Sequence, residues 1–373
     1  MPIFIKEINE SHLNYFIDFP YKLFKKNPYW VGDLKSNVKK TLSLSNPFWF
    51  HCERKLFLAE NEKGEILGRI AAIINRNHNS FHEEQCGFFG FFDCIDNAEV
   101  SKLLFARAEE YLKEKGMDIM RGPANPSSND IWGMLIEGFD SQNMVMMPYN
   151  PSYYVDLTEN YGFKKEKDLY AFKFLTVNGF PERFEKIVNR SLKAGNIKIE
   201  KADIKNINKV ITDFKDVYNQ AWEKNWGFVP MTEQEIDYMA DELKDLIKPN
   251  YLFFIKVDDK VAGCCLMFPD FNIALKAANG SLNPLNIFPF LWKFLFGLNR
   301  GRLLALGVKN EYRNRGLELV LIREAIKNAL KLGWEFGELS WTLEDNHKIN
   351  TIIKDIGGIL YKKYRIYSKK IKS

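Results

Sequence analysis

The order of predicted elements occurs twice along this chain, and this internal repeat restricts the fold more than any other feature. Residues 56–74 alternate into one strand, turn at a charged stretch that contains glycine, and return as a second apolar strand. Residues 251–268 have the same layout, with Asp258 and Asp259 at the turn. The sequence therefore predicts two β-hairpins at matching places in the two halves of the chain.

Each hairpin is followed by an apolar strand, a helix that ends in glycine, and a further strand. A strand, a helix and a strand in this spacing predict a right-handed crossover between parallel strands. We therefore expect the α/β class (α+β, with mixed sheets): two tandem domains, each with a central mixed β-sheet flanked by helices. The segments are 87–95, 99–116 and 117–123 in the first half, and 302–308, 317–333 and 334–341 in the second.

Glycine and proline interrupt the periodicity near residues 175–185, and we place the domain boundary there, which gives domains 1–178 and 179–373. A length of 373 residues also favours about two domains. Apolar residues make up 46% and charged residues 27% of the chain, which is the composition of a folded protein rather than a disordered one.

Charge and composition argue against several classes of protein. The 53 basic and 48 acidic residues give a net charge of +5, which is too balanced to indicate a nucleic-acid partner. No apolar run reaches the roughly 18 to 20 residues needed to span a bilayer. The N-terminus lacks the regions of a signal peptide, so we expect a cytoplasmic protein. The five cysteines form no CxxC pair and are expected to be reduced core residues.

Three potential metal ligands, His78, His82 and Cys86, recur at every fourth position, a spacing that on a helix is typical of a metal site. The surrounding stretch NRNHNSFHEEQCG has the composition of a loop, so we expect no metal there. The adjacent Cys264 and Cys265 lie in a predicted strand with no base visible nearby, which favours packing over nucleophilic catalysis.

The turn between residues 302–308 and 317–333 is the strongest functional signal in the sequence. The first N–H groups of a helix lack partners and, with the helix dipole, form an anion site. Arg313 and Arg315 add positive charge, and Gly316 lets the backbone approach an anion without a Cβ in the way. The turn therefore suits a phosphate, although a solvated basic turn with a glycine at the helix entry has the same sequence.

This turn and the order of elements around it resemble the GNAT acyltransferase superfamily, whose signature Gln/Arg-x-x-Gly-x-Gly/Ala holds the pyrophosphate of acyl-CoA. Arg313 and Gly316 match this signature, whereas Glu318 replaces a small residue and would repel phosphate. The resemblance implies acetyl-CoA or another acyl-CoA as cofactor, bound by the second domain. The cofactor-binding residues that it implies are Leu306, Gly307, Val308, Arg313, Asn314, Arg315, Gly316, Leu317 and Asn346.

The first half has no comparable turn, because only the acidic stretch DNAEV, without glycine, precedes its helix. The chain is thus similar to double-GNAT acyltransferases in which one half binds the cofactor and the other has lost the site. The activity implied is N-acyl transfer, in which an amine attacks the thioester directly and no covalent enzyme intermediate forms.

The resemblance also implies where the chemistry takes place. Backbone N–H groups near Gly307 and Val308 are the expected oxyanion donors, and Leu306 is expected to line the channel for pantetheine. Glu338 and Glu344 lie on or just after the neighbouring strand and are candidate bases. Each of them is equally well explained as an ordinary solvated carboxylate.

The tyrosine that serves many GNAT enzymes as general acid is missing, since Ile353 occupies its place in NHKINTIIKDIGG. Tyr361 and Tyr364 follow closely and are the candidate substitutes. Recurring aromatic residues on a strand also occur for packing alone, and that interpretation stays open.

Two segments combine amide and aromatic side chains and are candidates for the acceptor pocket: residues 121–133, and residues 219–230, which in GNAT folds cover the acceptor side. Proline, asparagine and serine also make ordinary turns, so that alternative remains. The candidate substrate-binding residues are Asn125, Ser128, Trp132, Trp222, Asn225 and Trp226.

The segment 281–302, SLNPLNIFPFLWKFLFGLNRGR, precedes the predicted cofactor strand and is unusually apolar. Its short helix either fills the core between the domains or lies at a membrane interface, with Arg300 and Arg302 near lipid phosphates. The second interpretation predicts peripheral contact of residues 286–298 with the inner membrane face and long-chain acyl transfer to a lipid, sphingoid-type amine. A small-molecule amine acceptor, a non-catalytic acyl-CoA-binding or scaffold protein, and a monomer or a dimer remain alternatives.

Overall fold

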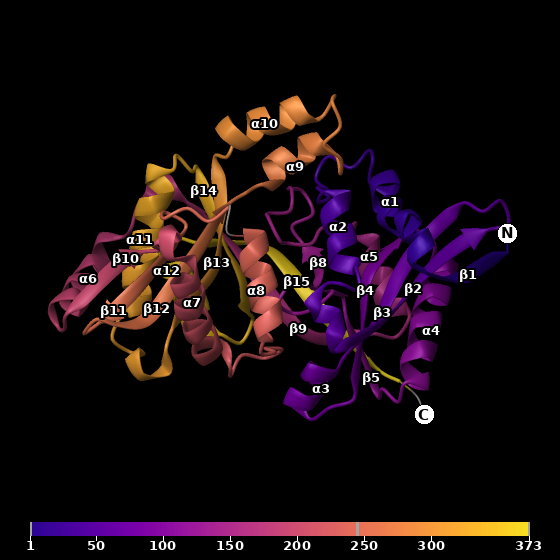
Figure 1. Cartoon of the computed structure of the whole chain (residues 1–373), viewed down its shortest axis with the longest axis horizontal. Coiled ribbons are helices and arrows are strands. Elements are labelled where there is room, and N and C mark those ends of the chain that lie inside the picture. Colours follow the sequence, from indigo (N-terminus) through magenta and orange to yellow (C-terminus); the bar gives the residue numbers. More distant parts are fainter. Residues whose placement is uncertain (1, 244–245, 372–373) are drawn as a thin grey trace. The chain divides into compact units, whose positions relative to one another are not determined.

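The computed structural model describes residues 2–243 and 246–371, which fold as two compact units (Figure 1). The units are not the two contiguous halves of the sequence, since two segments of the second half belong to the first unit. The sequence boundary at residue 178, which concerns the repeat, stays a prediction. The first unit comprises the chain up to Leu169, Phe271–Gly297 and the stretch from Lys362; the second comprises Tyr170–Asp270 and Leu298–Tyr361.

The first unit is built on a mixed sheet in the order β1-β2-β3-β4-β5, with the C-terminal part of β15 beside β5. Only β4 and β5 run parallel, and helix α4 connects them and packs on the sheet through Val100, Leu104 and Ala108. The strands are β1 (Ile3–Ile8), β2 (Cys52–Asn61), β3 (Ile66–Asn75), β4 (Cys86–Cys94), β5 (Ile119–Gly122), β6 (Ala124–Asn125), β7 (Ile131–Trp132) and β8 (Met134–Glu137). The helices are α1 (Leu13–Leu23), α2 (Lys35–Leu42), α3 (Arg76–His82), α4 (Ala98–Glu114), α5 (Tyr153–Asn160), α9 (Asn272–Ala278) and α10 (Ile287–Phe296).

The second unit has a sheet in the order β10-β11-β12-β13-β14, in which only β13 and β14 run parallel. Helices α6 and α11 pack on one face, through Val188 and Val320, and α7 packs on β12 and β13. The strands are β10 (Ile197–Lys201), β11 (Leu252–Val257), β12 (Lys260–Pro269), β13 (Arg300–Val308) and β14 (Phe336–Leu343). The helices are α6 (Glu182–Lys193), α7 (Ile207–Trp222), α8 (Glu233–Leu243), α11 (Leu317–Lys331) and α12 (His347–Asp355). Two of the four unit boundaries fall inside β9 (Lys164–Leu175) and β15 (Ile359–Lys370).

The repeat predicted from the sequence is confirmed. β2 pairs with β3, and β11 with β12, as the two hairpins, and Asp258 and Asp259 form the second turn with φ of 50° and 61°. The helices α4 and α11 join the two parallel strand pairs. Gly116 and Gly333, with φ of 78° and 70°, follow these helices as predicted, because a residue with positive φ at this place favours glycine.

Local predictions had mixed outcomes. The prediction of a loop around His78 is wrong. This stretch forms helix α3, which Asn75 caps by accepting from the His78 N–H. The apolar segment before β13 does not fill a core, since none of the residues of α10 is buried. All five cysteines are buried free thiols, as predicted. Among the described residues, no helix combines the length and apolarity needed to cross a membrane.

Candidate functional site

The parallel strands β13 and β14 of the second unit diverge halfway along their length. Their ladder runs from the pair Arg300 and Phe336 to the pair Leu303 and Leu339. The register between β12 and β13 shifts at this point, which leaves Leu304 as an extra residue in β13. Beyond this bulge β13 continues to pair with β12, while β14 leaves it.

The backbone of β13 beyond the bulge presents N–H groups on the side that β14 has left. The Lys309 N–H donates to the Ala262 carbonyl at 2.9 Å, and ladder bonds alternate along an antiparallel pair. The N–H groups of Leu306 and Val308 therefore point away from β12, whereas the Gly307 N–H points toward it. Gly307 instead leaves room for a neighbouring side chain, because a Cβ on it would lie 2.5 Å from the indole of Trp222.

The turn before α11 has the geometry of an anion site. Gly316 precedes the helix with φ of 73° and ψ of 14°, and no described side chain caps the first turn. Ser191 of α6 donates to the Arg315 carbonyl at 2.7 Å, and a Cβ on Gly316 would lie 2.6 Å from the same hydroxyl. The turn therefore requires glycine, and the first N–H groups of α11 are left for another acceptor.

Arginine side chains hold and surround this turn. The Arg313 guanidinium donates to the carbonyls of Ala221 and Val308 at 2.9 Å and 3.4 Å, which ties the turn to the end of α7 and to β13. Arg315 is exposed, with its guanidinium 5.4 Å from the ring centroid of Tyr312. Arg313 thus holds the turn in position, and the charged group of Arg315 faces solvent.

Glu318, the departure from the family signature, has a cationic partner. Its carboxylate lies 3.3 Å from Nζ of Lys348 on α12, and the same Nζ donates to Oδ1 of Asn314 at 3.3 Å. The negative charge that the sequence places near the phosphate site is therefore compensated, and the pair ties α12 to the turn. Leu317, the predicted neighbour, is buried.

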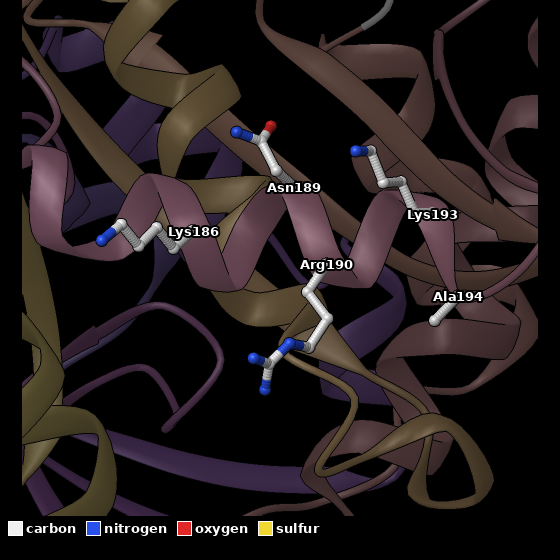
Figure 2. A pocket seen from close by; sticks show the side chains of 5 residues that line it. All are labelled: Lys186, Asn189, Arg190, Lys193 and Ala194. Carbon is white, nitrogen blue, oxygen red and sulfur yellow. The ribbon is translucent and has the colours of Figure 1, made fainter.

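A basic hollow lies on the exposed face of α6 and is lined by Lys186, Asn189, Arg190, Lys193 and Ala194 (Figure 2). Lys186, Arg190 and Lys193 have no ion-pair partner within the described parts of the chain. Ser191, which contacts the turn before α11, lies on the same helix. The sequence analysis missed this hollow, although the spacing of its basic residues places them on one helical face.

A buried polar cluster lies on β13, β14 and the start of β15, where the two parallel strands begin to diverge. Glu338 is fully buried and pairs with Arg302 in the ladder, with 3.7 Å between the carboxylate and Nε of Arg302. Ser340 and Tyr361 both donate hydroxyl hydrogen bonds to the Glu338 carboxylate. Arg302 in turn donates to the Ser340 hydroxyl at 2.8 Å.

This cluster brings together two of the four predicted catalytic residues, Glu338 and Tyr361, and adds Arg302 and Ser340, which the sequence analysis did not assign to catalysis. The signal that could have found them is the alternation along each strand, which puts Ser340 on the same face as Glu338.

The other two predicted catalytic residues lie elsewhere. Glu344 follows β14 and is partly exposed, and its carbonyl accepts from Asn350 at 3.4 Å. Tyr364 is fully buried within the first unit, where it pairs with Leu135 of β8. Asn346, a predicted cofactor residue, caps α12 by accepting from the Ile349 N–H.

The predicted acceptor residues fall in both units. In the second unit Trp222 stacks on Tyr218 with 5.1 Å between ring centroids and lies beside Gly307. Asn225 follows it, donating its N–H to the Trp222 carbonyl at 2.7 Å, and Trp226 is partly buried.

In the first unit, Trp132 is buried against Phe88. Ser128 is partly buried in the turn between β6 and β7. The side-chain oxygen of Asn125 accepts from the backbone N–H of Phe91 and so binds the protein's own backbone. Contact of these residues with a substrate stays a prediction.

The first unit contains the counterpart of the diverging strands, with the space occupied by its own chain. β4 is bulged opposite β3 beyond the parallel ladder with β5, as β13 is. The backbone N–H of Phe91 in this bulge donates to Asn125, and a Cβ on Gly90 would lie 1.7 Å from the Ala124 carbonyl. Asn97 caps α4 by accepting from two N–H groups of its first turn.

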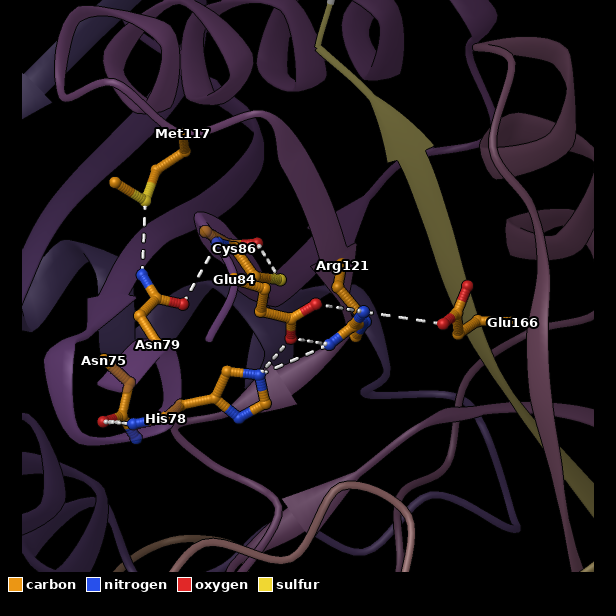
Figure 3. Close-up of polar contacts among 9 residues, drawn as sticks. Asn75, His78, Asn79, Glu84, Cys86, Met117, Arg121 and Glu166 are labelled. Carbon is orange, nitrogen blue, oxygen red and sulfur yellow. Dashed lines mark hydrogen bonds and ion pairs between the residues drawn. The ribbon is translucent and has the colours of Figure 1, made fainter. Parts of the chain in front are cut away.

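The histidine stretch of the first unit forms an ion-pair network (Figure 3). Potential ligand atoms of His78, Glu84 and Cys86 lie within 4.8 Å of one another. Arg121 donates to both carboxylate oxygens of Glu84, at 2.6 Å and 3.1 Å, and so supplies the positive charge that a cation would supply. Burial raises the pKa of Glu84, but hydrogen bonds from His78 and Arg121 outweigh it and lower this pKa to about 2.

Comparisons with known proteins agree with this geometry. A family model described as "Acetyltransferase (GNAT) family" matches residues 211–350. "Bacterial ceramide synthase" of Caulobacter vibrioides is 32% identical over 96% of this chain and 95% of its own length. "Protein YghO" of Escherichia coli is 31% identical over 98% of this chain and 94% of its own length. A solved tandem GNAT protein from the clavulanic acid biosynthesis pathway has a TM-score of 0.60 at 10% identity, covers 100% of this chain and 99% of that chain, and shows the fold alone.

Proposed function

We propose that this chain, which belongs to the GNAT family and is an N-acyltransferase, moves a long acyl group from acyl-CoA to the amine of a lipid. The acyl-CoA is placed in the second unit, between the diverging halves of β13 and β14. The observation that carries this placement is the bulged β13, whose N–H groups on the side away from β12 lead toward the uncapped start of α11. A pyrophosphate at that helix start and a pantetheine along β13 would provide acceptors for these donors, to which the described residues offer no side-chain acceptor.

The chemistry follows from this placement. The amine nitrogen of the acceptor attacks the thioester carbon, the carbonyl oxygen becomes an oxyanion, and the C–S bond then breaks to release the CoA thiolate. The N–H groups of Leu306 and Val308 are the proposed donors to the pantetheine and the oxyanion. The attacking amine must lose one proton, and the leaving thiolate must gain one.

We assign the proton transfers to Tyr361 and Glu338. Tyr361 is partly exposed and donates to the fully buried Glu338, so its hydroxyl is the end of this pair that faces reactants. In the proposed relay the amine proton passes to the phenol oxygen as the phenol proton passes to Glu338. As the C–S bond breaks, the phenol gives its proton to the CoA thiolate and regains one from Glu338, which returns the pair to its starting state. Arg302 and Ser340 are positioning residues, which keep the carboxylate in place and balance its charge.

The acceptor is proposed from the relatives rather than from a pocket. The protein named bacterial ceramide synthase matches this chain over nearly its whole length, and ceramide formation joins a fatty acyl group to the amine of a long-chain base. We therefore propose a long-chain amine as acceptor and place the enzyme in the cytoplasm, where it works at the inner face of the membrane. Acetylation of a small amine is the second candidate, favoured by the description of the matching family model.

The nucleotide end of CoA is assigned to α6. Lys186, Arg190 and Lys193 lie on the helix whose Ser191 contacts the turn before α11. We propose that this basic hollow receives the 3′-phosphate of CoA, since unpaired cations beside a pyrophosphate site attract a further phosphate.

Turnover of defined pairs of substrates tests the function. The purified chain is incubated with palmitoyl-CoA or acetyl-CoA and with sphinganine, spermidine or ethanolamine, and the amide products are measured by mass spectrometry. We expect palmitoyl transfer to sphinganine to exceed every other pair by at least about 100-fold in kcat/KM, as expected for a site built for a long apolar chain. A preference for acetyl-CoA with a short amine would replace the lipid assignment, and CoA binding without any amide product would contradict the function as a whole.

A further inference from the structure

The surface of helix α10 is apolar and uncovered. No residue of this helix is buried, and the exposed fractions of Phe288, Trp292 and Phe296 are 73%, 62% and 72%. Leu285, just before the helix, is 85% exposed, and Leu295 is 65% exposed. A contiguous set of large apolar side chains left in water is unfavourable and marks an interaction site.

The helix is held on a defined support. α10 packs on α9 (Figure 1), where Phe294 stacks on Phe271 with 5.6 Å between ring centroids. Asn286 donates to the Ala278 carbonyl at 3.0 Å and so ties the start of α10 to the end of α9. The exposure of α10 is therefore a property of packed structure and not of a frayed segment.

The support itself is anchored to a basic part of the first unit. Lys276 of α9 donates to the carbonyls of Asn27 and Trp30 at 3.1 Å and 2.7 Å. The segment that it binds follows the exposed residues Lys25 and Lys26. The support of α10 is thus bound to a chain segment that carries exposed cations.

The charge of the segment that carries the helix has one sign. Residues 271–297 contain Lys276 and Lys293 and no aspartate or glutamate. An apolar segment that carries two lysines and no carboxylate of its own is complementary to a bilayer that contains anionic lipids. The cores of protein interfaces are depleted of lysine as well as of acidic residues, so lysines without carboxylates favour a bilayer over a soluble partner or a second copy of this chain.

We infer that α10, with Leu285, is a membrane-docking helix that lies in the headgroup region of an anionic bilayer, with Phe288, Trp292 and Phe296 in the acyl chains. Its 10 residues span about 15 Å, half of the roughly 30 Å of a hydrocarbon core, so the helix lies in the interface and does not cross it. Lys293 on the helix extends its amine toward lipid phosphates. None of these residues is among those proposed for acyl transfer, and the docking surface does not depend on the identity of the acceptor.

Vesicle binding tests the inference independently of turnover. The variant Phe288→Ser, Trp292→Ser, Phe296→Ser is compared with a control in which three other exposed aromatic residues of the first unit are changed, Phe4→Ser, Tyr15→Ser, Phe50→Ser. Cosedimentation is measured with vesicles of phosphatidylcholine and phosphatidylglycerol, and with phosphatidylcholine alone. The oligomeric state is measured by light scattering, and acyl transfer by turnover of a short, water-soluble amine or of sphinganine in detergent.

We expect the wild type and the control to bind the mixed vesicles, and the α10 variant to bind at least about 100-fold more weakly, because three large apolar side chains are lost. Binding to vesicles of phosphatidylcholine alone should be weaker by up to about tenfold, since the lysines of this segment then lack anionic partners. Equal binding of the α10 variant and the control would overturn the inference. A wild-type dimer that the α10 substitutions convert to a monomer, without vesicle binding, would identify the surface as a self-association interface instead. Turnover that persists in detergent while docking fails separates this result from a failure of the proposed function.

Discussion

The two units have the same scaffold, but side chains accept from its backbone N–H groups in the first unit and not in the described part of the second. Each has a bulged strand beside a parallel neighbour that diverges from it, and a helix that joins the two strands. In the first unit Asn125 accepts from the bulge and Asn97 accepts from the start of α4. In the second unit the corresponding groups on β13 and at the start of α11 have no such side chain among the described residues. A buried N–H group needs an acceptor, so one unit satisfies its donors internally and the other leaves them for a ligand.

The units differ in charge at a further matched position. The third pair of the parallel ladder is Phe88 with Arg121 in the first unit and Arg302 with Glu338 in the second. Arg121 donates a hydrogen bond to Glu84, whereas Glu338 accepts a hydrogen bond from the hydroxyl of Tyr361. The first unit therefore lacks a proton acceptor at this place as well as an open anion site. A few side chains thus decide whether this scaffold can be catalytic.

The largest expected effect tests the matched ladder position. Glu338→Gln should lower kcat by about 100-fold or more, because the proposed proton acceptor is lost while the shape of the side chain remains. The amide oxygen of glutamine can keep only one of the two hydrogen bonds that the carboxylate accepts. The dissociation constant of CoA, measured by calorimetry, should stay within about twofold, which separates a loss of chemistry from a loss of binding. The matched control is Glu84→Gln in the first unit, which should leave kcat unchanged. Equal loss in both variants would mean that the units do not differ as described.

A smaller effect is expected at the turn before α11. Gly316→Ala should weaken CoA binding by about tenfold, because a Cβ at φ of 73° is strained and would press on the Ser191 hydroxyl. Gly116→Ala at the end of α4 has the same strain at φ of 78° with nothing within 4 Å. That control should lose stability without losing CoA affinity. A similar affinity for both variants would show that the turn is not the phosphate site.

The basic hollow on α6 is expected to contribute a further part of the cofactor affinity. The variant Lys186→Gln, Arg190→Gln, Lys193→Gln should bind CoA about five- to tenfold more weakly, as for the loss of a few partly screened phosphate contacts. Its affinity for 3′-dephospho-CoA should equal that of the wild type. Lys102→Gln, Lys113→Gln on the exposed side of α4 is the matched control and should change neither affinity. A loss of affinity for both CoA and 3′-dephospho-CoA would mean that the hollow contacts a part of the cofactor other than the 3′-phosphate.

The smallest effect concerns acid stability, which the account assigns to the first unit. The pKa of Glu84 is lowered to about 2 and that of His78 is lowered by burial, so both groups bind fewer protons in the folded state. Each therefore contributes stability at neutral pH that is lost on acidification: His78 below its ordinary range, and Glu84 between about pH 5 and pH 2. Thermal unfolding of Glu84→Gln should show a shallower fall of Tm over the lower window. An unchanged slope would remove this carboxylate from the acid response.

Much of the architecture could be predicted because it depends on local patterns. The hairpins, the crossover helices and the turn at Gly316 follow from alternation, helical spacing and glycine positions. The bulge at Leu304 and the sharing of β9 and β15 between units could not be predicted, since strand register and strand exchange leave no local signal.

The candidate site was predictable in part for the same reason. Glu338 and Tyr361 could be named as carboxylate and phenol near the expected strand, but their hydrogen bond joins residues on different strands. Asn125 has the composition of a pocket residue, and only the fold shows that it accepts from Phe91. The apolar composition of α10 favours burial, so its exposure had to come from the structure.

Amide hydrogen exchange with and without CoA tests whether CoA binds the second unit and not the first, because it reports on both units in one experiment. We expect slower exchange at Leu306, Val308 and the first turn of α11 when CoA is bound, with one CoA per chain. Exchange at Phe91 and at the start of α4 should not change. Protection of the first unit, a second bound CoA, or no protection at β13 would contradict the assignment of one open and one self-occupied scaffold.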